Sequence, residues 1–142
     1  MFIDIKNLLD EPNVRRIMGE AEFDNSPEVM EKKAEEYKNR NDFHLYGWSE
    51  NNMLLGTCGV EVHSEWVVIR SIAVEPNART CGVGRKMITA IQEIYKTTIK
   101  AETDDDAVGF YQKCGFETKG FIKTYSNGKC QRYECVLLIG EQ

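Results

Sequence analysis

The feature that most constrains the fold is an apolar segment that leads through two glycines into an amphipathic helix. Residues 66–74 are almost entirely apolar, which is typical of a strand buried at the centre of a sheet. A short loop follows at residues 75–78, and from residue 84 to residue 95 the apolar side chains recur at helical spacing. A central strand that continues into a helix predicts a fold of the α/β class.

The other segments predict a mixed sheet with helices beside it. Short links join the strands expected at residues 43–48, 53–63 and 66–74, so these three should form an antiparallel meander. We expect the second of them to bend at Gly56 or Gly59. Further strands are expected at residues 2–6, 97–102, 116–124 and 131–139, the last two as a hairpin, and further helices at residues 11–22, 27–38 (with Ser26 as its N-cap) and 104–114.

Length and composition limit the classes of protein to consider. The chain has 142 residues, 42% hydrophobic and 29% charged, so we expect residues 1–142 to form one globular domain. A net charge of −5 without a basic stripe argues against nucleic-acid binding. It mildly favours a cationic partner such as an amine, although such a charge more often serves solubility alone. Neither a membrane span nor a signal peptide is apparent, so the expected location is the cytoplasm.

The five cysteines and two histidines show no metal-binding pattern. There is no C-x-x-C pair, and the spacings do not suit zinc. We therefore expect no structural metal, and we expect reduced cysteines that are mostly packed in the interior.

Residues 79–85 combine the features of an anion-binding loop. The N-terminus of a helix has unpaired backbone N–H groups and a partial positive charge. Glycines in front of such a helix, here Gly82 and Gly84, let backbone amides approach a phosphate without a side-chain clash. Arg79, Arg85 and Lys86 add positive charge. The same glycines also suit a tight structural turn, so the loop alone leaves both interpretations open, and it matches neither the P-loop nor the dinucleotide fingerprint.

Two motifs here resemble the signatures of the GNAT superfamily of acetyl-CoA-dependent N-acetyltransferases. Arg79-x-x-Gly82-x-Gly84 is similar to that family's pyrophosphate loop, [QR]-x-x-G-x-[GA]. The segment from Asp104 to Phe116 is similar to a second signature, N-x-x-A-x-x-[LF]-Y-x-x-x-G-F. The motifs occur in the family's order, and the expected elements follow the order of the family's fold.

The resemblance implies a fold and a coenzyme site. The fold is a mixed, mostly antiparallel sheet flanked by helices, in which the strands ending at Val74 and Glu102 splay apart to admit acetyl-CoA. Backbone groups of Ile72, Ala73 and Val74 would bind the pantetheine arm, and an amide on this strand would face the thioester carbonyl. The residues that the resemblance places at the rest of the coenzyme are Arg79, Thr80, Cys81, Gly82, Val83, Gly84, Arg85 and Asp104.

The resemblance also implies a catalytic role for Tyr111. Acyl transfer from a thioester expels a thiolate, and a thiol pKa near ~8.5 lies below the ~10 of tyrosine, so the phenol can donate to the leaving sulfur. The alternative is that Tyr111 only forms part of the cleft wall, as we expect of its neighbour Phe110.

Asp104 and Cys81 each allow more than one role in the coenzyme site. The family's usual asparagine is Asp104 here, and its carboxylate would repel a phosphate but suits a helix N-cap. Cys81 lies in the phosphate loop, where a backbone role fits better than a nucleophile. Because no Cys/His pair suits a covalent acyl-enzyme, direct attack of the amine is the simpler mechanism.

The carboxylate base that some members carry on the central strand is missing, since residues 67–69 are apolar. Glu61, His63 and Glu65 are the candidates for a base that acts through water, although each also suits a surface position. Arg70 stands alone among apolar neighbours and either points into the acceptor cleft or pairs with Glu61.

The sequence thus predicts an enzyme that moves the acetyl group of acetyl-CoA directly to a primary amine of a small molecule or peptide. The alternative is a catalytically weak acyl-CoA sensor or regulatory module of the same fold. The acceptor stays open among a polyamine, an aminoglycoside, an amino acid and a protein amine, in a groove lined by the two early helices and the terminal hairpin. The edge of that hairpin also suits pairing with a second copy as a homodimer.

Overall fold

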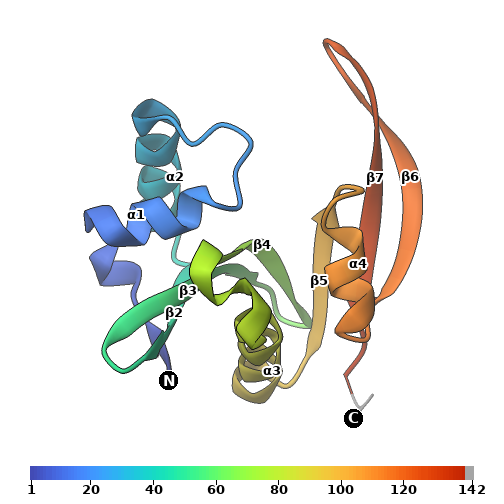
Figure 1. Cartoon of the computed structure of the whole chain (residues 1–142). Helices are drawn as coiled ribbons and strands as arrows, with labels where there is room; N and C mark the ends of the chain where they lie inside the picture. The colour runs from blue at the N-terminus through green and yellow to red at the C-terminus, as the bar shows by residue number, and fades with distance from the viewer. Residues whose placement is uncertain (140–142) are drawn as a thin grey trace.

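The computed structural model describes residues 1–139, over which seven strands form one sheet in the order β1-β2-β3-β4-β5-β7-β6 (Figure 1). All neighbouring pairs are antiparallel except β4 and β5, which are parallel. The strands are β1 (Phe2–Asp4), β2 (Phe43–Glu50), β3 (Met53–Val62), β4 (Trp66–Val74), β5 (Thr98–Thr103), β6 (Glu117–Tyr125) and β7 (Gly128–Leu137). The mixed, mostly antiparallel sheet with a central β4 confirms the expected fold class.

Helices cover both faces of the sheet. On one face, α1 (Pro12–Gly19) packs against β3 and β4 and α2 (Pro27–Asn39) packs against β2, with a core that includes Met18, Tyr37 and Phe43. On the other face, α3 (Val83–Tyr95) and α4 (Val108–Lys113) pack through a larger core that includes Met87 and Tyr111. Figure 1 shows α1 and α2 on one side of β3 and β4 and α3 on the other, with α4 beside β5 and β7.

The sheet opens between β4 and β5. Their parallel pairing covers only the three residue pairs from Trp66–Thr98 to Val68–Lys100. Beyond Val68 the β5-facing edge of β4 has no strand partner, although β4 continues to Val74. The two strands therefore diverge toward their C-terminal ends, which confirms the expected splay.

A bulge interrupts the pairing of β3 with β4. Gly59 faces Ser71 and Val60 faces Ile69, so Arg70 is an extra residue without a partner in β3. A Cβ atom at Gly59 would overlap the hydroxyl of Tyr37 from α2. Glycine at this position thus lets the tyrosine pack onto the sheet at the bulge. The sequence allowed a bend in β3 at Gly56 or Gly59, and the irregular register lies at Gly59.

Several predicted boundaries hold and some are wrong. The limits of β4 agree with the prediction, and Ser26 caps α2 by accepting a hydrogen bond from the Val29 amide at 3.4 Å. The segment expected as a loop after β4 contains a 3-10 helix, η2 (Pro76–Cys81), and another short one, η1 (Lys6–Leu8), follows β1.

The largest error in the helices concerns α4, which begins at Val108 rather than at residue 104. Asp104 is the reason, because its Oδ1 accepts hydrogen bonds from the amides of Asp106 and Ala107, each at 3.0 Å. These local bonds hold the segment in a turn instead of a helix. The expected domain extends to residue 142, and its last three residues lie outside the described part of the chain. Among residues 1–139, no helix has the length and apolar character needed to cross a membrane.

Candidate active site

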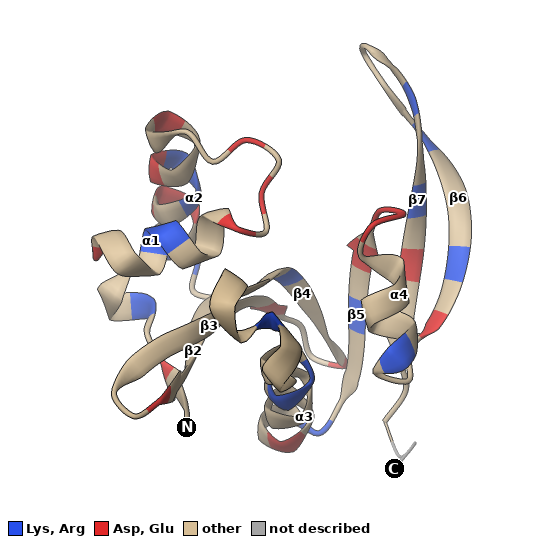
Figure 2. Ribbon diagram, in the orientation of Figure 1, with Lys and Arg blue, Asp and Glu red and all other residues tan. Residues whose placement is uncertain are grey.

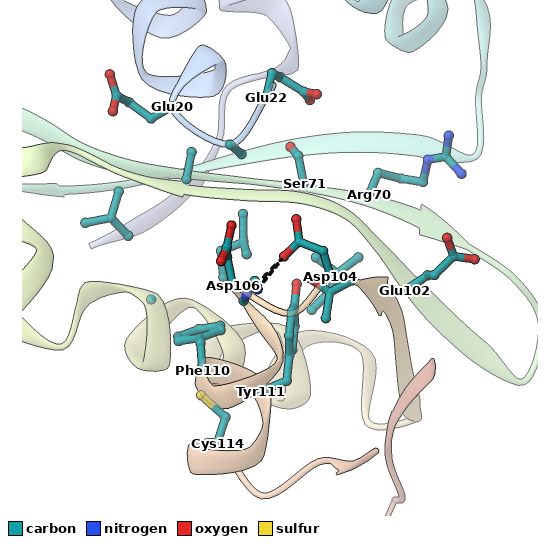
Figure 3. Close-up of a pocket in the computed structure, with 18 of the residues that line it drawn as sticks. Glu20, Glu22, Arg70, Ser71, Glu102, Asp104, Asp106, Phe110, Tyr111 and Cys114 are labelled. Atoms are coloured by element: carbon teal, nitrogen blue, oxygen red, sulfur yellow. Dashed lines mark hydrogen bonds between the residues drawn. The ribbon is translucent and has the colours of Figure 1, made fainter. Parts of the chain in front are cut away.

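The opening between β4 and β5 forms a cleft of about 1210 Å³. Its central wall is β4 from Ile69 to Val74. The loop between α1 and α2 covers one side, and the segment from η2 into α3 together with α4 covers the other (Figure 3). Of the residues that the sequence assigned to the site, those that line the cleft are Ile72, Ala73, Val74, Arg79, Gly82, Gly84, Arg85, Asp104 and Tyr111.

Gly82 gives the loop before α3 its conformation. It has a φ of +73°, in the left-handed region, and a Cβ atom there would have no neighbour within 4 Å. It is also the N-cap of α3 and supplies no side chain to the amides of the first turn. The first intrahelical bond runs from the Lys86 amide to the Gly82 carbonyl, so the amides of Val83, Gly84 and Arg85 precede the helix ladder. An exposed helix start of this kind is suited to bind an anion.

Gly84 has a different reason for being glycine. A Cβ atom at this position would lie 2.8 Å from the Phe110 ring. The absent side chain lets α4 approach the first turn of α3, and this contact closes one side of the cleft. The two glycines of the loop motif thus serve conformation and packing respectively, and the backbone of both remains at the cleft wall.

The cations of the loop are less free than the sequence suggested. Arg79 donates to Glu20 at 2.7 Å and to the Val74 carbonyl at 3.3 Å. Arg85 donates to the Lys113 carbonyl. Lys86 lies 3.4 Å from Glu50 and does not line the cleft. Positive charge at the loop therefore comes chiefly from the helix start and two anchored arginines.

Thr80 and Cys81 are exposed in η2 and do not line the cleft. Val83 is buried in the core beneath the loop, so only its backbone is available to a ligand. Of residues 79–85, Arg79 and Arg85 line the cleft with their side chains, whereas Gly82, Val83 and Gly84 shape the loop.

Tyr111 is fixed in the cleft wall. Its side chain is 5% exposed, and its ring packs edge-on against Phe110 and Phe116 with centroid distances of 5.2 Å. Figure 3 shows the hydroxyl directed from α4 toward β4, without a hydrogen bond to any residue drawn. Burial raises the pKa of Tyr111 above its ordinary value, so the phenol keeps its proton at neutral pH. A neutral phenol that is held rigidly and has no hydrogen-bond partner among residues 1–139 can donate to a reacting atom.

Four of the five acidic residues that line the cleft lie in two loops (Figure 2). Glu20 and Glu22 lie after α1, whereas Asp104 and Asp106 lie before α4. Asp104 acts as the cap that its sequence position suggested, because its Oδ1 accepts two backbone hydrogen bonds. A carboxylate committed to this turn still leaves its other oxygen toward the cleft.

Several cleft residues were missed by sequence reasoning, among them Glu22, Phe23, Glu102 and Arg132. Phe23 is fully exposed in the loop between α1 and α2. Glu102 lies at the end of β5, where it accepts from Arg132 at 3.0 Å and from Lys123 at 3.2 Å. The signal available in the sequence was only general, in that the early helices and the terminal hairpin were expected to line an acceptor groove.

The candidates for a water-mediated base lie outside the cleft. Glu61 and His63 are 2.6 Å apart, and neither lines the cleft, nor does Glu65. Both positions expected for Arg70 are observed together: the residue lines the cleft, and its guanidinium lies 3.6 Å from Glu61.

The cysteines agree only in part with their prediction. Cys58 and Cys135 are buried, Cys114 is half-buried at the cleft, and Cys81 and Cys130 are exposed, so the expectation of mostly packed thiols is wrong for the last two. All five are free thiols. Among residues 1–139, no three His, Cys, Asp or Glu side chains gather as they would around a metal ion.

Comparison with known proteins agrees with this geometry. The model of the acetyltransferase (GNAT) family matches residues 7–116, and the chain therefore belongs to this family of acyltransferases. A Bacillus methanolicus protein described as an uncharacterized N-acetyltransferase in the lysA 3′ region is 29% identical over 86 residues, which are 60% of this chain and 71% of that protein.

Solved structures show the same fold. The ribosomal-protein-S18-alanine N-acetyltransferase from Escherichia coli has a TM-score of 0.76 at 16% identity, over 100% of this chain and 95% of that chain. An aminoglycoside 6′-N-acetyltransferase complexed with coenzyme A has a TM-score of 0.75 at 13% identity, over 100% and 98%.

Proposed function

We propose that residues 1–142 act as one N-acetyltransferase domain that transfers the acetyl group of acetyl-CoA directly to a primary amine of a small molecule or peptide. The observation that carries this proposal is the opening between β4 and β5, with the α3 helix start at one end and the Tyr111 hydroxyl at its centre. A family member whose solved structure contains coenzyme A supports the choice of cosubstrate.

The cleft residues fit the parts of acetyl-CoA. The open edge of β4 at Ile72, Ala73 and Val74 offers backbone groups to the amides of the pantetheine arm. The amides of Val83, Gly84 and Arg85, which precede the helix ladder, suit the pyrophosphate, because they combine N–H donors with the positive end of α3. The open space around the missing Cβ of Gly82 admits a ligand at this point. In the proposed reaction acetyl-CoA is the cosubstrate, and we expect no metal ion to take part.

The proposed reaction uses positioning more than acid–base groups. The amine attacks the thioester carbonyl, a backbone N–H of β4 stabilises the oxyanion, and Tyr111 donates to the departing sulfur. The amine loses its proton to water or to a base that we do not assign to a residue. Val67 and Ile69, on the central strand, are buried apolar residues and offer no carboxylate.

Two assays test the proposal. Titration calorimetry should detect binding of coenzyme A to the purified protein, and release of free thiol from acetyl-CoA should depend on an added amine. A protein that binds coenzyme A but releases no thiol with any amine would fit the acyl-CoA sensor instead. A protein that shows no heat with coenzyme A would refute both functions.

The remaining expectations belong to the same proposal. We place the enzyme in the cytoplasm, with acetyl-CoA and an amine as its partners and neither nucleic acid nor membrane. The edge strand β6 exposes Ile122 and Tyr125, which favours pairing with a second copy as a homodimer. Light scattering of the purified protein would test this last point.

A further inference from the structure

We propose that the amine accepted at this cleft also carries a carboxylate, and that Arg70 binds this carboxylate. The acceptor is then a small amino acid rather than a polyamine or an aminoglycoside. This inference rests on the acetyltransferase function proposed above.

The bulge in β4 places Arg70 on the acceptor side. In a regular strand, successive side chains point to opposite faces. Here Arg70 and Ser71 both line a small cavity against α2, together with Tyr37 and Lys33, so the extra residue turns Arg70 to the same face as Ser71. Both residues also line the main cleft (Figure 3). Coenzyme A would occupy the opposite side, where α3 and α4 pack, and the acceptor therefore enters past Arg70.

The Arg70 guanidinium has unused donor groups. The nearest carboxylate in the described chain is Glu61 at 3.6 Å, beyond hydrogen-bond distance, and Glu61 is itself 2.6 Å from His63. The other arginines of the cleft, in contrast, all donate hydrogen bonds to protein oxygens. The Arg70 guanidinium carbon lies over the Phe43 ring, 5.2 Å from its centroid, and 43% of the side chain is exposed. A planar guanidinium fixed in this way suits bidentate binding of a carboxylate.

The charge of the cleft argues against a polycation. The chain as a whole has a net charge of −5, but six basic and five acidic side chains line the cleft. The acidic residues on the acceptor side already have cationic partners: Glu22 is 3.3 Å from Lys33, Glu20 pairs with Arg79, and Glu102 pairs with Arg132. A polyamine would therefore meet Arg70 beside carboxylates that are already paired with cations, and of the acidic cleft residues in the described chain only Asp104 and Asp106, before α4, have no ion pair.

A panel of matched acceptors tests the inference. Thiol release from acetyl-CoA would be measured with free amino acids, their carboxamides, spermidine and an aminoglycoside. We expect the free amino acids to be preferred. In Arg70→Gln, the KM for the preferred amino acid should rise about 10- to 100-fold with little change in kcat, because a charge-assisted pair is lost. The KM for its carboxamide should not change.

Arg40→Gln is the matched control. Arg40 stacks on the same Phe43 ring at 4.3 Å and pairs with Asp42, but it does not line the cleft. Arg40→Gln should leave the KM of every acceptor unchanged. Thermal unfolding should show that both Arg40→Gln and Arg70→Gln fold. Arg70→Lys should recover only part of the affinity, since it keeps the charge but loses the planar fork.

The outcomes separate this inference from the proposed function. Turnover that favours spermidine or the aminoglycoside, or a KM that rises equally for the amino acid and its carboxamide, would overturn the role of Arg70 and leave the acetyltransferase intact. Binding of coenzyme A without turnover of any amino acid would also overturn it. Absence of both coenzyme binding and turnover would refute the proposed function itself.

Discussion

Replacement of Tyr111 by phenylalanine should slow the chemical step while the protein stays folded. The variant keeps the ring that packs between Phe110 and Phe116, and none of the residues drawn around the hydroxyl in Figure 3 hydrogen-bonds it. We therefore expect the free energy of unfolding to change by less than about 0.5 kcal/mol. If the phenol donates to the departing sulfur, kcat should fall about 100- to 10,000-fold, which corresponds to about 3–5 kcal/mol in the activation barrier.

The pH dependence gives an independent test of the same role. Because burial raises the pKa of Tyr111, the phenol stays protonated to a higher pH than an exposed tyrosine. The kcat of the native enzyme should therefore show no decrease caused by this group below about pH 10.

The measurement is free thiol release at saturating acetyl-CoA and amine, with coenzyme A affinity measured by calorimetry. Tyr125→Phe, at an exposed tyrosine of the hairpin, is the control and should be silent. A kcat in Tyr111→Phe within about threefold of the native value would show that the tyrosine is only part of the cleft wall, because general acid catalysis contributes far more than that.

The other predictions concern the loop, the bulge and the thiols. Gly82→Val should abolish coenzyme A binding in calorimetry, because the φ of +73° suits glycine and a valine would turn the loop amides away. Gly128→Ala, with a φ of +137° in the distant hairpin, is the control and should leave the affinity unchanged. Equal affinity in both variants would show that the loop is not the phosphate site. Gly59→Ala should lower the free energy of unfolding by about 1–3 kcal/mol in urea titrations, because its Cβ meets the tyrosine hydroxyl on α2, and a change near zero would mean that the bulge rearranges freely. Alkylation monitored by mass spectrometry should modify the exposed thiols of Cys81 and Cys130. Coenzyme A should protect only Cys81, because this residue adjoins Gly82 at the cleft wall, and equal protection of both thiols would contradict a coenzyme site at the loop.

The apolar pattern and the capping residues were sufficient to predict those elements whose structure depends on residues close in sequence. The nine residues of β4 are apolar enough to mark a central strand, and the Ser26–Pro27 pair marks a helix start through its own side chain and ring. The splay of β4 and β5 was predicted only through the resemblance of two motifs to a family. Nothing in the apolar pattern of either strand states where their pairing must end.

Contacts between distant residues explain most of what the sequence did not reveal. Arg79 was expected to attract a phosphate, but its partner Glu20 is 59 residues away and takes one of its donor groups. The meeting of Tyr37 with Gly59 could not be predicted either, because it depends on how α2 lies across the sheet. The late start of α4 had a local cause, since an aspartate that caps a turn competes with the helix for backbone amides.

The splay and the bulge together explain how one strand can serve two substrates. Beyond Val68 the splay leaves the edge of β4 free for a coenzyme that enters from the side of α3 and α4. The bulge at Arg70 then turns two consecutive side chains toward α1 and α2, where a regular strand would present only one. The acyl group and the amine would thus meet at the edge of β4, near the Tyr111 hydroxyl, without competing for the same side of the sheet. Because the position of each substrate is set by backbone geometry, residues on the acceptor side can vary in charge without altering the coenzyme site, and the preference for an acceptor should depend on side chains such as Arg70.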